Sequence, residues 1–287
     1  MLAIHVINLD RRPDRLAALS SRLDMLGLGW NRVAAIDAMA RDPAELSRAF
    51  GAGPASRAFP ATPGDMACSL THQRLWHEIA SARVEAAIVL EDDAGLADSF
   101  ADLANCDLAG VMRRNGMGAM KLEFWPGPQS SRRFPVGQDL GPVNGSIRLF
   151  RMRSSFLGTC AYVITAEAAR KLLSAHRVLE VPVDHFLFGQ SAGRGFDLLR
   201  PGFVNPAPVL HDVDRFGSDI SAERPAKPPR RPFARRWHEY RQLRKEEAAL
   251  SRGECERVEM RYAGDAPRAS TPSSLWSPSG SASENPE

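Results

Sequence analysis

The chain has no apolar run approaching the ~20 residues that a membrane-spanning helix needs. Its longest apolar stretches, at residues 4–9 and 86–90 of 287, have only the length of a β-strand. Residues 1–10 lack the basic start and the cleavage site of a signal peptide. These absences predict a cytoplasmic protein.

Cysteine is scarce, with four residues that are widely spaced and form no Cys-x-x-Cys pair. This pattern excludes a zinc knuckle and a disulfide framework. The sequence also has no internal repeat. The remaining composition, 44% hydrophobic and 25% charged residues, is that of an ordinary globular protein with enough material for a sizeable core.

The net charge of +3 is unevenly distributed. Residues 224–252 contain ten Lys or Arg against three Glu, a net charge of +7, so the rest of the chain carries −4. A mildly acidic body is therefore followed by a strongly basic segment.

The first 36 residues predict a βαβ unit. Residues 4–10 form an apolar run that turns polar at its end, and Pro13 suits the first turn of a helix. Four leucines then recur at helical spacing, and residues 30–36 provide a second strand. The unit predicts an α/β fold with a mainly parallel sheet. The leucines of the predicted helix are Leu16, Leu19, Leu23 and Leu26.

The alternation of helices and strands continues to about residue 210. Residues 126–156, rich in Gly, Pro and Arg, predict a long functional loop with little regular structure. Further helices are predicted at residues 64–82 and 166–176, and further strands at residues 85–90, 118–124, 159–164 and 196–200.

Composition divides the chain into three parts. Residues 1–222 form the predicted α/β domain. Residues 223–252 contain a proline-rich linker and a basic helix at about 233–250, and residues 253–287 predict a disordered Ser/Pro-rich tail.

The most informative motif is Glu91-Asp92-Asp93, which directly follows the apolar strand at residues 85–90. Ligands of open α/β sheets bind in the crevice at such strand ends. Three adjacent carboxylates repel one another, so a divalent cation, Mn²⁺ or Mg²⁺, is their natural partner. The alternative interpretation is a solvated acidic turn.

Other segments resemble the glycosyltransferases of family 25, which include lipooligosaccharide and collagen galactosyltransferases. Six short pieces occur in the order found in that family, and together they span residues 4–220. They are Ile7-Asn8-Leu9-Asp10-Arg11-Arg12 with Asp14-Arg15, Gly64-Asp65-Met66-Ala67-Cys68-Ser69-Leu70-Thr71-His72, Val89-Leu90-Glu91-Asp92-Asp93, Gly158-Thr159-Cys160-Ala161-Tyr162, Pro182-Val183-Asp184 and Ser218-Asp219-Ile220.

The resemblance implies a GT-A type, Rossmann-like nucleotide-diphospho-sugar transferase fold. It implies that Asp93 is a metal ligand and that Glu91 or Asp92 faces the ribose or the metal. Four residues near the first strand would lie beside the nucleotide. The donor would be a UDP-sugar, most often UDP-galactose, used with inversion. The residues beside the nucleotide would be Asn8, Leu9, Asp10 and Arg15.

The chemistry of such a transfer agrees with these assignments. Departure of UDP develops negative charge that a divalent cation stabilises. Inversion requires the acceptor hydroxyl to attack from the opposite face, and a carboxylate acting as general base can take its proton. Asp184 is the candidate base; its alternative role is the N-cap of a helix beginning at His185.

Five further residues are weaker candidates for the donor site. Asp37 ends the second strand, where it could accept a hydrogen bond from uracil or ribose. Ser69 and His72 share a helix face, and His72 is otherwise a hydrogen-bonded core histidine. His211 is a candidate metal ligand or a surface histidine. Lys121 could pair with phosphate or stand at an exposed strand end.

The basic helix carries an aromatic stripe at a spacing of three to four residues, formed by Phe233, Trp237, Tyr240 and Leu243. Arginines beside the stripe complete a pattern typical of a helix on an anionic membrane surface. Such a helix suits a peripheral protein of the inner membrane with a lipid-linked saccharide acceptor. The alternative is a helix packed against its own domain. Nucleic-acid binding is disfavoured because the rest of the chain is acidic.

The leading hypothesis is therefore an inverting hexosyltransferase of lipopolysaccharide or other surface-glycan assembly. A metal-dependent nucleotidyltransferase is a first alternative, but residues 10–15 lack the glycine of a phosphate-binding loop. A catalytically silent nucleotide- or glycan-binding protein on the same fold is the second.

Overall fold

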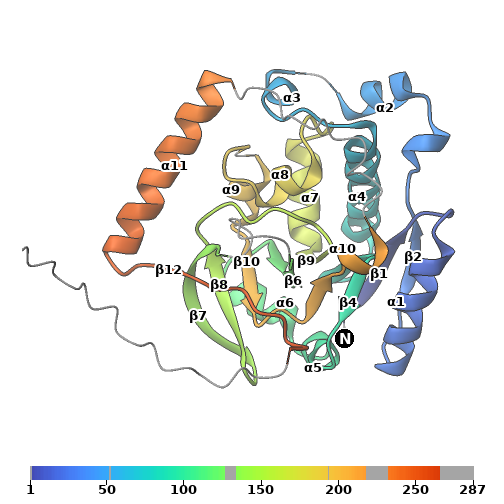
Figure 1. Cartoon of the computed structure of the whole chain (residues 1–287), viewed down its shortest axis with the longest axis horizontal. Coiled ribbons are helices and arrows are strands. Elements are labelled where there is room, and N and C mark those ends of the chain that lie inside the picture. Colours follow the sequence, from blue (N-terminus) through green and yellow to red (C-terminus); the bar gives the residue numbers. More distant parts are fainter. Residues whose placement is uncertain (1, 52, 127–133, 193, 218–231, 266–287) are drawn as a thin grey trace, which may run out of the picture.

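The computed structural model describes residues 2–51, 53–126, 134–192, 194–217 and 232–265 (Figure 1). The predicted linker and most of the predicted tail therefore lie outside the described residues, as does the Ser218-Asp219-Ile220 motif. Among the described residues, no helix is long and apolar enough to cross a membrane.

A nine-stranded sheet forms the centre of the molecule, with the strand order β12-β7-β8-β10-β5-β9-β3-β1-β2. A second sheet of three short strands has the order β4-β11-β6. The strands are β1 (Ala3–Asn8), β2 (Asn31–Ala34), β3 (Ala86–Glu91), β4 (Ala94–Leu96), β5 (Ala119–Lys121), β6 (Glu123–Phe124), β7 (Val136–Asn144), β8 (Ile147–Met152), β9 (Ala161–Thr165), β10 (Gly202–Asn205), β11 (Val209–His211) and β12 (Glu256–Arg257).

The large sheet is mixed. Parallel pairing joins β1 to β2 and β3, and also β10 to β5. Strand β9 runs antiparallel to both β3 and β5. With the antiparallel pairs at β8 and β12, six of the nine described strands run in one direction and β8, β9 and β12 run in the other.

Helices cover both faces of this sheet (Figure 1). Successive side chains of a strand point to opposite faces, and β3 follows this rule: Ile88 packs with α1, α5 and α6, whereas Val89 packs with α4, α7 and α8. The result is the three-layer α/β architecture expected from the sequence. The helices are α1 (Pro13–Met25), α2 (Pro43–Phe50), α3 (Pro54–Ala58), α4 (Pro63–Ser81), α5 (Ser99–Ala104), α6 (Leu108–Arg114), α7 (Ala166–Ala175), α8 (Val183–Phe188), α9 (Gly195–Leu199), α10 (Val213–Phe216) and α11 (Phe233–Ser251), with a 3-10 turn, η1 (Ala38–Ala40).

The predicted βαβ unit is confirmed by β1, α1 and β2. Pro13 occupies the first turn of α1, and Leu19 and Leu23 are buried on its inner face. The adjoining helix α4 begins with a capping box, in which Thr62 accepts from the N–H of Asp65 and Asp65 accepts from the N–H of Thr62. Local sequence therefore determines both helix starts.

The prediction of an irregular loop over residues 126–156 is wrong in its second half. Strands β7 and β8 form an antiparallel hairpin in which Asn144 pairs with Ile147, so the two-residue turn is Gly145-Ser146. Gly145 has φ +51°, the positive φ that the first position of such a turn requires. The Gly-Ser pair was the sequence signal for this hairpin.

Two other expectations also need correction. Residues 196–200, expected as a strand, lie mostly in α9, and the strand β10 begins only after Pro201. Of residues 253–287, expected to be disordered, the described part up to residue 265 returns to the large sheet: β12 pairs with β7, and Val258 and Met260 are buried. This pairing is non-local, so no pattern within residues 253–287 indicates it.

Candidate functional site

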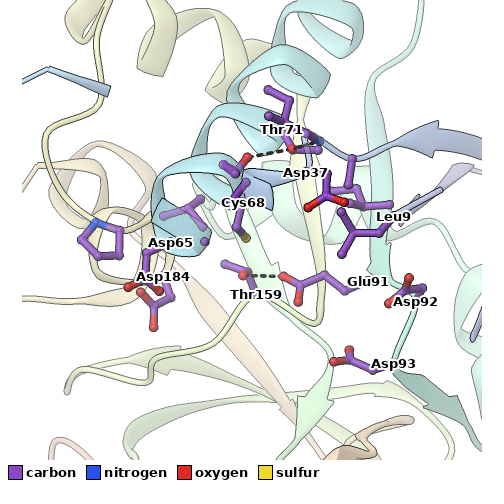
Figure 2. Close-up of a pocket in the computed structure, with 18 of the residues that line it drawn as sticks. Leu9, Asp37, Asp65, Cys68, Thr71, Glu91, Asp92, Asp93, Thr159 and Asp184 are labelled. Carbon is purple, nitrogen blue, oxygen red and sulfur yellow. Dashed lines mark hydrogen bonds between the residues drawn. The ribbon is translucent and has the colours of Figure 1, made fainter. Parts of the chain in front are cut away.

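A cavity of about 350 Å³ opens at the carboxyl ends of β1 and β3 (Figure 2). The loops after these strands, the start of α4, the Gly158-Thr159 segment and the start of α8 form its walls. Of the residues predicted from the sequence, those that line it are Leu9, Arg15, Asp37, Glu91, Asp92, Asp93, Asp184 and His211. The cavity therefore lies where the strand-end argument predicted.

The three carboxylates of the acidic triplet have different surroundings. Asp92 is 6% exposed, accepts a hydrogen bond from Asn8 Nδ2 at 2.7 Å and pairs with Arg15 at 3.2 Å. Burial raises the pKa of Asp92, and the hydrogen bond from Asn8 opposes that rise. Each oxygen of Asp92 thus has a protein partner, and its role as a metal ligand stays a prediction.

Asp93 instead faces His211 from β11. Nε2 of His211 lies 3.3 Å from Oδ2 of Asp93. Burial lowers the pKa of His211, but its hydrogen bond to Asp93 and the nearby carboxylates outweigh burial and raise the pKa to about 9. The pKa of Asp93 is lowered, because the hydrogen bond and charge of His211 overcome the opposing effect of burial.

This pair offers a place for a divalent cation. Oδ1 of Asp93 and Nδ1 of His211 are buried without a hydrogen-bond partner among the described residues. Cys160 Sγ completes a group of donor atoms within 4.8 Å of one another. Burial raises the pKa of the Cys160 thiol, so it remains protonated and suits hydrogen bonding to Asp93 better than metal binding. A carboxylate and an imidazole therefore fit a cation that accepts both oxygen and nitrogen, such as Mn²⁺.

Asp184 lies across the cavity from Asp92 and Asp93, with Thr159 and Glu91 between them (Figure 2). It occupies the first turn of α8, a helix whose N-cap is Pro182. The alternative interpretation of Asp184 as an N-cap is therefore wrong. Its Oδ1 accepts from the N–H of His185 at 2.7 Å, and the side chain is half-buried at the cavity wall.

Ser69 and His72 do not line the cavity. Both are fully buried on α4. Ser69 Oγ accepts from the N–H of Val183 at 3.0 Å and thereby fixes the start of α8 beside α4. His72 lies beneath the cavity, between Tyr162 Oη at 2.9 Å and Glu91 Oε1 at 3.3 Å.

Some of the residues predicted near the nucleotide line the cavity, and others only contact residues of its wall. Asn8 is buried below the cavity, where it binds Asp92 and accepts from Arg32. Asp10 is outside the cavity and pairs with Arg32. Asp37 lines the cavity, but its oxygens accept from the N–H of Met39 at 3.0 Å and from Arg11 Nε at 2.9 Å.

Arg15 is a wall residue with a second task. Its guanidinium group pairs with Asp92 and donates to the carbonyls of Phe216 and Gly217 at 3.0 and 3.1 Å. The arginine therefore links the α10 segment, which contributes Val213 to the cavity, to Asp92 after β3.

Lys121 is neither at an exposed strand end nor in the cavity wall. It is 1% exposed, and its ammonium group donates to Glu123 at 2.8 Å and to the carbonyls of Phe156, Leu157 and Gly158 at 3.0, 2.9 and 2.7 Å. Lys121 therefore stabilises the segment that contains Gly158 and Thr159, two residues of the cavity wall.

Several wall residues were not predicted as site residues. Helix α4 contributes Asp65, Cys68 and Thr71 to the wall. The sequence argument had selected their neighbours Ser69 and His72 instead. Trp125 follows β6 and carries no local signal. The unpredicted wall residues with polar, thiol or aromatic side chains are Arg11, Asp65, Cys68, Thr71, Trp125 and Thr159.

Comparison with known proteins matches the family model described as "Glycosyltransferase family 25 (LPS biosynthesis protein)" to residues 1–187. A glycosyltransferase 25 family member of Anopheles gambiae is 29% identical over 64% of this chain and 31% of its own length. Procollagen galactosyltransferase 1-B of Xenopus laevis is 27% identical over 64% of the chain and 30% of its own length. The inactive glycosyltransferase 25 family member 3 of Mus musculus is 28% identical over 64% and 31%. The matched region thus spans about a third of these relatives.

Proposed function

The chain belongs to glycosyltransferase family 25, and on this premise we propose that it is an inverting, metal-dependent glycosyltransferase. Its donor is a UDP-hexose, with UDP-galactose the first choice, and its acceptor is a saccharide of lipopolysaccharide or another surface glycan. The observation that carries the proposal is that Asp93 and His211 line one cavity with Asp184, and that each of the two has a buried polar atom without a hydrogen-bond partner among the described residues.

The residues of the cavity suit distinct parts of that reaction. Asp93 and His211 would hold Mn²⁺ near the leaving diphosphate. A bound cation neutralises charge that develops on the leaving diphosphate. Asp184 is on another wall, as a base facing the acceptor hydroxyl must be when the sugar is inverted. Asp37, at the Leu9 side, is proposed to lie beside the uridine.

The proposal predicts metal-dependent donor binding with a defined pH dependence. Isothermal titration with UDP-galactose is expected to show binding with Mn²⁺ and little without it. Because His211 has a pKa of about 9 without metal, it must lose a proton to bind the ion, so Mn²⁺ affinity should rise from pH 6 towards pH 9.

The matched control for this experiment is Asp98→Asn, an exposed aspartate away from the cavity. Asp93→Asn should abolish the Mn²⁺ dependence, whereas Asp98→Asn should leave it intact. Binding of every UDP-hexose tested without regard to Mn²⁺, or no binding of any, contradicts the proposal.

A silent binding protein is the second candidate, because one relative is named as an inactive member of the family. The two functions differ in one measurement. A silent protein binds the UDP-sugar with Mn²⁺ but releases no UDP when saccharide acceptors are added, whereas the enzyme releases UDP.

We also propose that α11 rests on an anionic membrane surface that carries the acceptor. One side of α11 contacts the domain: Arg235 lies over the ring of Phe59 and donates to the carbonyl of Ala58 at 2.5 Å. The other side is exposed and apolar, and the arginines near it supply positive charge. The exposed apolar residues are Phe233, Trp237, Tyr240 and Leu243.

Vesicle binding tests this surface. The double variant Arg236→Ser/Arg241→Ser should bind phosphatidylglycerol-containing vesicles about 30-fold more weakly, since each arginine near an anionic surface contributes about 1 kcal/mol. The control Arg41→Ser/Arg83→Ser removes two exposed arginines elsewhere and should bind as wild type does. Equal binding by both variants, or no preference for anionic over phosphatidylcholine vesicles, contradicts the proposal.

A further inference from the structure

A buried chain of hydrogen bonds runs from the helical layer to the cavity. Trp76 Nε1 donates to Tyr162 Oη at 3.0 Å, Tyr162 Oη lies 2.9 Å from His72 Nδ1, and His72 Nε2 lies 3.3 Å from Glu91 Oε1. Trp76 is 1% exposed, and Tyr162 and His72 are fully buried. Only the last member, Glu91, reaches the cavity wall.

The donors and acceptors of this chain determine where its hydrogens lie. An indole N–H can only donate, so the Tyr162 oxygen accepts from Trp76. Burial raises the pKa of Tyr162 far above its ordinary value, so the phenol keeps its hydrogen. That hydrogen can be donated to Nδ1 of His72, which must then be unprotonated.

The opposite arrangement leaves a buried group unsatisfied. If Nδ1 of His72 carried a hydrogen, the Tyr162 oxygen would accept twice, and its own O–H would have no partner among the described residues. A buried donor without a hydrogen-bond partner destabilises the folded protein. The hydrogen of His72 therefore lies on Nε2 and is donated to Glu91.

Glu91 consequently has one committed oxygen and one that is available. Oε1 accepts from His72 Nε2 and from Thr159 Oγ1 at 2.6 Å. No described residue donates to Oε2, and the side chain of Glu91 is 23% exposed at the cavity. Figure 2 shows this carboxylate in the cavity, bonded to Thr159 and separate from Asp92 and Asp93.

We propose that Trp76, Tyr162 and His72 are positioning residues, which hold Glu91 so that its Oε2 accepts a hydrogen bond from a hydroxyl group of the nucleotide sugar. The inference rests on the proposed function, because it takes a nucleotide sugar as the ligand. It assigns the cation to Asp93 and His211, and it assigns recognition of a hydroxyl to Glu91. Both the transferred sugar and the ribose have hydroxyl groups that could donate to Glu91. UDP contains the ribose but not the transferred sugar, so a comparison of UDP and UDP-galactose binding distinguishes the two.

The same residues could be taken for a second metal site. Cys68 Sγ, His72 Nε2 and Glu91 Oε1 lie within 4.8 Å of one another. A metal needs an unprotonated nitrogen, however, and the hydrogen-bond chain places the hydrogen of His72 on the nitrogen of this group. Burial also raises the pKa of the Cys68 thiol, which keeps the sulfur protonated.

The first test is Tyr162→Phe, which removes the phenol oxygen and with it the hydrogen bond to His72 Nδ1. UDP-galactose affinity, measured by titration with Mn²⁺, is expected to fall about tenfold, because His72 is no longer held with its hydrogen directed at Glu91. Tyr262→Phe, at a half-buried tyrosine that does not line the cavity, is the matched control and should bind as wild type does. An equal fall in UDP affinity assigns the hydroxyl to the ribose; an unchanged UDP affinity assigns it to the sugar.

A double-mutant cycle separates positioning from a general structural effect. If Tyr162 acts through Glu91, Tyr162→Phe should weaken binding in wild type but have little further effect in Glu91→Gln. Additive losses, or Tyr162→Phe binding both ligands as wild type does, would overturn the proposal.

Nitrogen-15 NMR of labelled histidine gives a readout that needs no ligand. The His72 signals, identified by their loss in His72→Gln, should show hydrogen on Nε2 and none on Nδ1, and added Zn²⁺ should leave them unchanged. Hydrogen on Nδ1, or coordination of Zn²⁺ by Nε2, contradicts the proposal. Failure of wild type to bind any UDP-sugar would refute the proposed function instead, while the NMR result would still report on the chain.

Discussion

Lys121→Met is expected to lower the free energy of unfolding by about 3–5 kcal/mol, because it leaves a buried carboxylate without its cation. Glu123 is 2% exposed, and its Oε1 is the partner of the Lys121 ammonium at 2.8 Å. The same substitution removes the donor for the carbonyls of residues 156–158. Chemical denaturation monitored by fluorescence and circular dichroism measures the loss.

The control is Lys171→Met, at an exposed lysine that pairs with Glu167 one helical turn away at 2.6 Å. An exposed ion pair contributes about 0.2–1 kcal/mol, so this variant should remain close to wild type. The pair of variants also tests the role of Lys121 in phosphate binding that the sequence suggested. A stable Lys121→Met protein with weakened UDP binding would restore that role and contradict the structural one.

Combining Lys121→Met with Glu123→Gln should recover part of the lost stability. The amide oxygen of glutamine can still accept from the N–H of Ala161, which now donates to Glu123 Oε2 at 2.8 Å. The charge, whose burial is the costly element, is absent from the double variant.

Gly158, which lies beside this ion pair, should tolerate no side chain, because a Cβ atom at this position would overlap with Glu123 Oε1.

Local patterns predicted the parts of the fold that local interactions determine. Pro13 and the leucines that follow it specify α1, and the apolar run before Glu91 specifies the central strand β3. The position of the acidic triplet at the end of that strand followed from the same argument. The sequence therefore predicted the strand end at which the cavity opens.

The sequence of the acidic triplet does not indicate which partners Asp92 and Asp93 have in the folded protein. Asp92 and Asp93 are adjacent, and Arg15 lies 3.2 Å from the first and 3.9 Å from the second, yet it is Asp93 that faces His211, 118 residues away in the sequence. Which partner each carboxylate meets depends on the direction of its side chain at the end of β3 and on the packing of β11 beside β4.

Helix α4 shows that neighbouring positions of one helix can have different surroundings. Successive residues of an α-helix point about 100° apart. Asp65, Cys68 and Thr71 line the cavity, whereas Ser69 and His72, each one position after a wall residue, are fully buried. The motif identified the helix, and only the packing of α4 determines which of its residues reach the cavity.

Asp184→Asn is expected to reduce turnover by about 10²- to 10⁴-fold while leaving UDP-galactose affinity close to that of wild type. The asparagine keeps the shape of the side chain, and its oxygen can still accept from the N–H of His185. It cannot take a proton from the acceptor hydroxyl. Turnover is measured as UDP release with a saccharide acceptor that the wild-type protein uses, and affinity by titration with Mn²⁺.

Asp197→Asn is the matched control, because Asp197 is an exposed aspartate in the first turn of another short helix, α9. It should have wild-type turnover. Asp65 provides a competing assignment, since it also lines the cavity; however, its Oδ2 already accepts from the N–H and the hydroxyl of Thr62, each at 3.0 Å.

Asp65→Asn should therefore act mainly on the start of α4, with a loss of about 0.5–2 kcal/mol in stability and a much smaller change in turnover. The reverse result, in which Asp65→Asn loses turnover and Asp184→Asn keeps it, would move the base to α4. Because Ser69 links the two segments through the N–H of Val183, a base on either side would face the same part of the cavity. The comparison of the two variants thus decides whether the general base is Asp65 at the start of α4 or Asp184 at the start of α8.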